Sequence, residues 1–229
     1  PPPPPPPRPP PPPPPPPRVL ASSHAFTLAE VLVTLGIIGV VSAMTVPSLM
    51  QNHQKKTYVT QLHKVYNEAQ QMALQYMTDS NALNLSEAGI NSQSKANEFV
   101  TKYFRIVQKC EKQLTPCFAE QYKTIDGNVV SGHAVNVNSY VLASGVSIRA
   151  LYNKVNDKVI NIMVDTNGQK GPNILGRDMF FMALYNNGII DTEISDTPTP
   201  PFTEEQRNSA SGNWKPFGDI LNDNWEMTY

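Results

Sequence analysis

Glu30 is the only charged residue between Phe26 and Met50, in a segment that is otherwise almost wholly apolar. As a helix this segment would be about 37 Å long at about 1.5 Å per residue, enough to cross a hydrocarbon core of about 30 Å. A lone carboxylate inside lipid costs several kcal/mol. A carboxylate in this place therefore needs a partner, and a cation would offset much of the cost.

Cleavage between Ala25 and Phe26 would create such a cation. The new α-amino group of Phe26 would lie within about one helical turn of Glu30. In a second copy of the helix, shifted along its axis, the amine could face this carboxylate. The pair would then set the stagger between neighbouring subunits.

Two other interpretations of the segment remain open. A secretory signal peptide would use Val31 to Val41 as its apolar region and Ala43 as its cleavage site, but the preceding flank is acidic where a basic one is expected. A plain single-pass anchor explains the length of the segment and leaves Glu30 without a role.

The stretch AFTLAEVLVTLGIIGVVSA resembles the N-terminal prepilin motif of type IV pilins and type II secretion pseudopilins. The matching features are a small residue before the cut, Phe26, and the acid at the fifth position of the mature chain. The resemblance implies cleavage after Ala25 by an inner-membrane prepilin peptidase, methylation of the Phe26 amine by the same enzyme, and assembly through Glu30. The family usually has Gly where this chain has Ala25.

The resemblance further implies a structural subunit of a pilus-like filament, not an enzyme. Its partners would be other pilin or pseudopilin subunits and an inner-membrane assembly machinery. A single helix would span the inner membrane, with the soluble domain in the periplasm or in an extracellular filament. The loop DTNGQKGPN and the ending DNWEMTY are also similar to pseudopilin-like sequences, and the loop favours a type II secretion pseudopilin. The alternatives are a minor type IV pilin for adhesion or DNA uptake, and an anchored binding domain that does not polymerise.

Three regions follow from this interpretation. Residues 1–25 form a leader whose tract Pro1–Pro17 is broken only by Arg8, and which we interpret as an arbitrary start or a ligand for a proline-binding domain. Residues 26–52 form the transmembrane or filament-core helix, and residues 53–229 form a periplasmic globular domain. Pro47 falls where the family has a kinking proline, although a proline can also end a helix.

The polarity changes beyond Pro47. Apolar residues then recur at spacings of three and four, which predicts an amphipathic helix over about residues 53–78. Its stripe favours covering a sheet of the same chain over forming a coiled coil, and consists of Val59, Leu62, Tyr66, Ala69, Ala73 and Tyr76. A second helix is expected from a cap at Ser94, with an apolar face that reaches Val107 and an end near Cys110.

Four short apolar runs between residues 139 and 190 predict strands joined by tight turns at Ala143–Gly145 and Asn187–Gly188. The expected fold is therefore α+β and pilin-like: a long N-terminal helix packed on one face of a small antiparallel sheet. We expect residues 192–229 to wrap the surface, held by Trp214, Phe217, Ile220, Leu221 and Trp225.

The remaining residues that could do chemistry are few. Cys110 and Cys117 are expected to form a disulfide outside the cytoplasm, with free thiols or a metal as the alternatives. Asp165, Asn167 and Asp178 could offer oxygens to calcium, although turn residues of this kind usually bond their own backbone. We otherwise expect neither cofactor nor metal.

Charge and motifs exclude further classes. The net charge is −1, and both basic residues of the leader lie outside the predicted domain, so no nucleic-acid partner is expected. The four histidines show no metal-ligand spacing, and neither a phosphate-binding loop nor a nucleophile motif is present.

Overall fold

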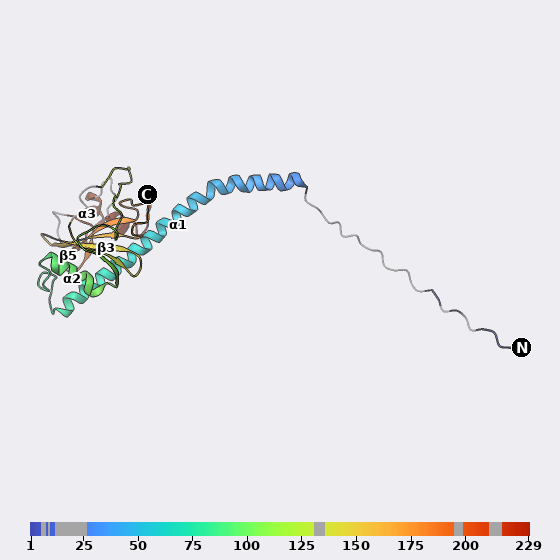
Figure 1. Ribbon diagram of the computed structural model, residues 1–229, viewed down its shortest axis with the longest axis horizontal. Coiled ribbons are helices and arrows are strands. Elements are labelled where there is room, and N and C mark those ends of the chain that lie inside the picture. The colour runs from blue at the N-terminus through green and yellow to red at the C-terminus, as the bar shows by residue number, and fades with distance from the viewer. Residues whose placement is uncertain (6–7, 9, 12–26, 131–135, 195–198, 211–216) are drawn as a thin grey trace. The chain divides into compact units, whose positions relative to one another are not determined.

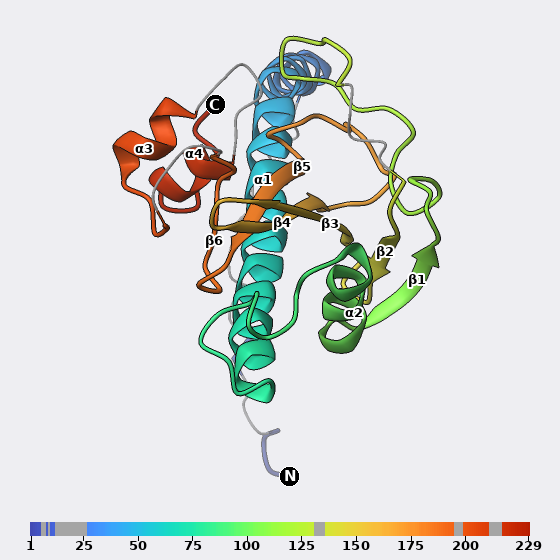
Figure 2. The same cartoon turned by 90° about the vertical axis from the view of Figure 1, so that its left-hand side faces the viewer.

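The computed structural model describes residues 1–5, 8, 10–11, 27–130, 136–194, 199–210 and 217–229. The chain divides at Pro47 into two compact units, Pro1–Pro47 and Ser48–Tyr229. Some of the elements are labelled in Figure 1, and all of them are labelled in Figure 2. Each unit is considered by itself below.

Helix α1 (Leu28–Asp79) begins in the first unit and continues in the second. Within the second unit one stripe of α1 is buried, and it includes Val59, Leu62, Ala69, Ala73 and Tyr76. The predicted amphipathic helix is therefore confirmed. Its stripe joins the largest apolar core together with residues of the sheet.

A six-stranded antiparallel sheet forms the rest of the core of the second unit. Strand order follows sequence order, so every connection joins neighbouring strands. The strands are β1 (Ile106–Cys110), β2 (Ser139–Leu142), β3 (Ser147–Val155), β4 (Lys158–Asp165), β5 (Met179–Tyr185) and β6 (Ile190–Asp191). The α+β class and the antiparallel sheet on a long helix agree with the expectation, and β1 and β6 are added to the four predicted strands.

Both faces of this sheet are covered, whereas only one covered face was expected. Ile148, Ile162 and Met182 lie in the core shared with α1. On the opposite face Met163 and Met179 pack with the segment that contains Phe118. This double burial explains why β4 reads as a nearly continuous apolar run rather than a strict alternation.

Helix α2 (Gln93–Tyr103) corrects two details of the sequence interpretation. Its cap is Ser92, whose side chain accepts a hydrogen bond from the Lys95 N–H, and not Ser94. The helix also ends before Phe104 and does not continue to Cys110. Residues 106–110 form β1, because pairing with β2 satisfies their backbone groups, and Val107 is 64% exposed on that strand.

The C-terminal region packs on the sheet edge and on α1 through two short helices, α3 (Glu204–Ser209) and α4 (Phe217–Asn222). Phe217 and Ile220 are fully buried, and the Trp225 ring stacks on His63 with 3.9 Å between ring centroids. The expected wrap is therefore partly helical. Trp214 lies outside the described residues. Figure 2 shows α3 and α4 beside β6, and α2 near β1 and β2.

Candidate functional site

The first turn of α1 is closed by a reciprocal pair of bonds between Thr27 and Glu30. The Thr27 N–H and hydroxyl donate to Glu30 Oε2 at 2.9 Å and 2.8 Å, and the Glu30 N–H donates to Thr27 Oγ1 at 3.2 Å. This is a capping box, which satisfies backbone donors that a helix start leaves without intrahelical partners. Glu30 thus has a partner in its own chain. Ala25 and Phe26, the predicted cleavage and methylation site, lie outside the described residues.

The following turns of α1 present a predominantly apolar surface. Large apolar side chains from Leu28 to Met50 are between 41% and 78% exposed in the single chain. The hydroxyls of Thr34 and Thr45 donate to backbone carbonyls of the preceding turn, so these polar groups are satisfied without water. By length and composition this helix can cross a membrane. Lipid or copies of the same helix are the environments that such a surface suits.

Pro47 lies inside α1, and the helix continues to Asp79. The alternative in which Pro47 ends the helix at the membrane surface is therefore wrong. A proline inside a helix removes one backbone hydrogen bond and favours a kink, so the kink remains the prediction for this position.

The loop between β4 and β5 holds the three residues considered for calcium. Asp165 Oδ1 accepts from the Asn167 N–H at 3.0 Å, and the other oxygen accepts from the buried Tyr122 hydroxyl. The carboxylate of Asp178 accepts from the N–H groups of Asn173 and Ile174 at 2.8 Å and 2.7 Å. These contacts match the turn interpretation. Calcium binding stays a prediction.

Burial changes the protonation of this loop. Desolvation raises the pKa of Asp165 to about 7, and it also raises the pKa of Asp178. The neutral form is therefore favoured more than for an exposed carboxyl. In the described part of the chain, His, Cys, Asp and Glu side chains form no cluster of three or more that could hold a metal ion.

Cys110 and Cys117 form a disulfide, as predicted, with their Cα atoms 6.1 Å apart. Both cysteines are buried in the smaller core on the second face of the sheet, next to Phe118 and Tyr122. The Ser147 hydroxyl donates to the Cys117 carbonyl and links this loop to β3. The disulfide therefore anchors the segment that covers the second face.

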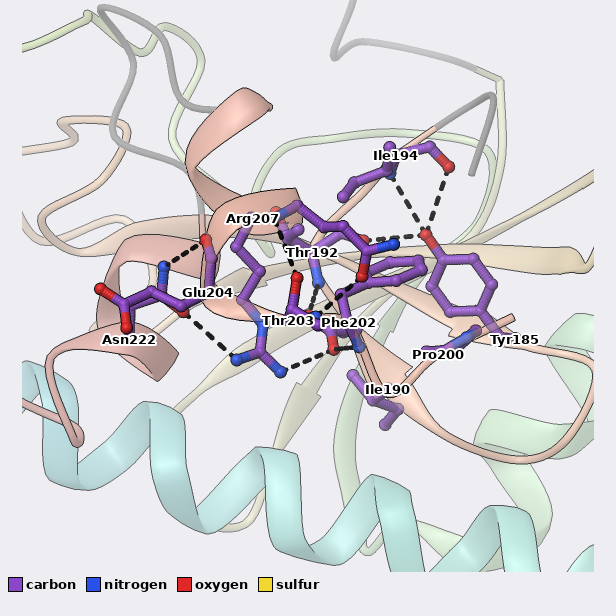
Figure 3. Close-up of polar contacts among 12 residues, drawn as sticks. Tyr185, Ile190, Thr192, Ile194, Pro200, Phe202, Thr203, Glu204, Arg207 and Asn222 are labelled. Atoms are coloured by element: carbon purple, nitrogen blue, oxygen red, sulfur yellow. Dashed lines mark hydrogen bonds and ion pairs between the residues drawn. The ribbon is translucent and has the colours of Figure 1, made fainter. Parts of the chain in front are cut away.

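Asp191 and Arg207 form an ion pair at the far edge of the sheet. Arg207 Nε and Nη2 donate to the two carboxylate oxygens of Asp191 at 2.9 Å and 2.8 Å. Asp191 also accepts from the Phe202 N–H, and Arg207 Nη1 reaches Asn222 Oδ1 at 3.2 Å. Figure 3 shows Arg207 between the backbone at Phe202 and the side chain of Asn222. The pair ties α3 and α4 to β6, which is a structural role.

Sequence reasoning overlooked the capping box and this ion pair. The capping box had a readable signal, because Thr27 and Glu30 have the T-x-x-E spacing. The ion pair had none, because its partners are separated by a segment without helical or strand periodicity. Only the folded chain brings them together.

Comparison of the chain with protein-family models, with curated proteins and with solved structures finds no significant match.

Proposed function

We propose that the chain is a structural subunit of a pilus-like filament, of the pilin or type II secretion pseudopilin kind, assembled through the first half of α1. The observation that carries the proposal is the position of Glu30. It is the only charge in the exposed apolar part of α1 from Leu28 to Met50, at the fixed distance from a prepilin-like cut site after Ala25 that the family motif requires.

Assembly would move this helix from lipid into a core of identical helices. Burial among sister helices would replace burial in acyl chains, so little hydrophobic free energy is lost. Glu30 would exchange its hydrogen bond from the Thr27 N–H for a charged bond from the Phe26 amine of a neighbouring subunit. A charge-assisted bond is about twice as strong as a neutral one, which favours the exchange in a dry core.

The length and packing of α1 also support the proposal. The second half of α1 packs on the sheet through its buried stripe, whereas the first half of α1 contains no buried residue. A subunit built in this way can present its N-terminal helix to neighbours without unfolding its globular unit. The chemistry at the cut site is done to the protein by a peptidase and methyltransferase, and the work of the protein itself is mechanical.

The test separates the charge of Glu30 from its capping bond. Glu30→Gln keeps an acceptor for the Thr27 N–H and removes the charge, whereas Thr27→Ala removes the hydroxyl of the cap and keeps the charge. Membrane-extracted protein and sheared filaments are compared by immunoblot, and the mature N-terminus is read by mass spectrometry. We expect N-methyl-Phe26 in all three proteins, and filaments only from wild type and Thr27→Ala.

Two results would contradict the proposal. A chain that keeps residues 1–25 in the cell, or that starts near Met44, has not been processed as a pilin. Equal filament incorporation of wild type and Glu30→Gln would remove the intermolecular role of Glu30 and leave the capping bond as its function.

A further inference from the structure

Three side chains that can react with one another meet on the second face of the sheet, the side of β4 that also carries Met163. Lys158 Nζ donates to Glu193 Oε1 at 2.5 Å, and Asn161 Nδ2 donates to the same oxygen at 2.9 Å. An amine, a carboxamide and a carboxylate therefore converge on one atom. All three residues belong to the globular unit Ser48–Tyr229.

A bulge in β4 allows this meeting. Lys158 and Asn161 are three residues apart, and residues at that spacing point to opposite faces of a regular strand. The pairing of β4 with β5 shifts its register between Lys158 and Ile160. An extra residue in one strand disturbs the alternation of its side chains. The amine and the carboxamide thus reach the same carboxylate from one side of the sheet.

The surroundings of the three side chains are dry. The side chain of Lys158 is only 3% exposed, although lysine is almost never buried without a partner. Directly opposite on β5, Tyr185 faces Lys158 and Ala183 faces Asn161, and both of these β5 residues are buried. Exclusion of water strengthens electrostatic interactions in such a place and keeps water from competing as a nucleophile.

The carboxylate of Glu193 is held from both sides of its backbone. The Tyr185 hydroxyl donates to the Thr192 carbonyl at 2.9 Å and accepts from the Ile194 N–H at 3.2 Å. Figure 3 shows these bonds around the Tyr185 hydroxyl. Both chain neighbours of Glu193 are therefore fixed to β5, and a fixed catalytic group loses little freedom when it reacts.

The carbonyl of the Asn161 side chain is left unsatisfied. Asn161 Oδ1 is buried, and it has no hydrogen-bond partner within the described residues. The reversed amide would place this oxygen against the carboxylate, so the bond from Nδ2 to Glu193 determines the orientation. A buried acceptor without a donor costs about 1–3 kcal/mol. A protonated Glu193 would supply the missing donor.

We propose that Lys158 and Asn161 join in an intramolecular isopeptide bond, with Glu193 as the catalytic base and acid. Nζ gives one proton to Glu193, and its lone pair attacks Asn161 Cγ. Glu193 passes that proton to Nδ2 and takes a second one from Nζ. The Cγ–Nδ2 bond breaks, ammonia leaves with the bonding pair, and the carbonyl re-forms. A secondary amide and a neutral Glu193 remain, so no other reactant is needed.

The link has two physical consequences for the globular unit. A neutral amide replaces the buried ammonium of Lys158, which removes the desolvation cost of that charge. The new ring also spans the bulge, so it fixes the register of β4 against β5. Escape of ammonia to solvent makes the reaction effectively irreversible.

Tryptic peptide mapping of the full chain, purified in detergent, tests the proposal. Trypsin cuts an unlinked chain after Lys154, Lys158 and Lys170. A linked chain resists cleavage at Lys158 and releases one peptide, residues 155–170, that is lighter by one ammonia than the unlinked peptide of the same span. We expect this peptide from nearly all of the wild type, without fragment ions from cleavage inside the ring.

Four variants test the role of each group. Lys158→Arg keeps a cation for Glu193 but cannot attack, because a guanidinium does not lose its proton in proteins, so no link should form. Glu193→Gln should also leave the chain unlinked. Asn161→Asp should still link, but with loss of water instead of ammonia, which a purely structural contact would not produce. Lys154→Arg changes an exposed lysine of the same unit and should leave the link intact.

Three results would overturn the proposal. The first is a wild type that yields residues 155–158 and 159–170 as separate peptides of full mass. The second is loss of ammonia with normal cleavage after Lys158, which would show a succinimide at Asn167–Gly168 instead. The third is a Glu193→Gln chain that links as completely as wild type. None of these results bears on the filament proposal, because the link lies wholly within the globular unit.

Discussion

The side-chain amide of Gln70 bonds both sides of the turn that contains Gly188. Gln70 Nε2 donates to the Gly188 carbonyl at 2.7 Å, and Gln70 Oε1 accepts from the Ile190 N–H at 2.9 Å. The side chain of Gln70 on α1 thus bonds two backbone groups of the β5–β6 connection, in the way that a neighbouring strand would. The contact joins the long helix to the last hairpin of the sheet.

Gln70→Ala should lower the free energy of unfolding of the globular unit by about 1–3 kcal/mol, because two backbone groups lose their partner in a half-buried place. Urea denaturation of the full chain in detergent, followed by tryptophan fluorescence, measures the loss. Gln71→Ala is the matched control, since Gln71 is exposed on the same helix and should change stability by less than about 0.5 kcal/mol. Equal effects of the two variants would contradict the structural role of the Gln70 amide.

Asp165 makes the stability of the globular unit depend on pH. Its pKa in the folded chain is raised to about 7 from a usual 3.8. The stabilising contribution of its neutral form is therefore complete below pH 3.8 and is lost as the pH rises through 7. Asp165→Asn stays neutral at every pH and does not lose this contribution. As the pH is raised from about 5 to about 8, the free energy of unfolding of Asp165→Asn should therefore rise relative to that of wild type by on the order of 2 kcal/mol.

Urea denaturation at a series of pH values measures this difference between variant and wild type. Asp126→Asn, in an exposed turn of the same unit, serves as the control for a generic loss of charge. If the free energies of unfolding of Asp165→Asn and wild type changed in parallel with pH, burial would not hold this carboxyl neutral.

Breaking the pair of Asp191 and Arg207 should destabilise the C-terminal helices strongly. Arg207→Met leaves a carboxylate that is 1% exposed without its cation, which should cost about 2–4 kcal/mol. The double variant Asp191→Asn with Arg207→Met should recover part of this loss, because no buried charge then remains. Urea denaturation measures the loss of stability. Limited proteolysis of the chain beyond residue 199 reports whether the C-terminal helices become accessible.

Lys95→Met provides the comparison for the ion pair. It breaks a pair with Glu98 whose side chains are 44% and 49% exposed, and it should change stability by less than about 1 kcal/mol. If Arg207→Met were as mild as Lys95→Met, the buried pair would not hold the C-terminal region.

The disulfide of Cys110 and Cys117 should protect both thiols in protein isolated from the cell. Alkylation in denaturant without reductant should add no label, and reduction first should add two, as counted by mass spectrometry. Replacing both cysteines by Ser should lower the free energy of unfolding by about 2–3 kcal/mol. Two labels without reductant would mean that the thiols are free in the cell.

Local sequence determined the elements whose signals are short in range. The spacing of Leu62, Ala69 and Ala73 determined the buried stripe of α1, and the turn residues around Gly145 and Gly188 determined two hairpins. The single charge at Glu30, on which the filament proposal depends, can be read from residue type and position alone. These features follow from the helical period, from the alternation of side chains along a strand and from the backbone conformations that turn residues allow. All three are set by residues that are close together in the sequence.

Only the tertiary structure decided the features that join distant segments. The apolar residues Ile106 and Val107 fit a helix as well as a strand by pattern, and pairing with β2 made them β1. The second covered face of the sheet, the bonds of Gln70 and the pair of Asp191 with Arg207 likewise depend on residues far apart in the chain. Such contacts form because buried polar groups must find partners, and the chain path that brings those partners together leaves no periodic trace in the sequence.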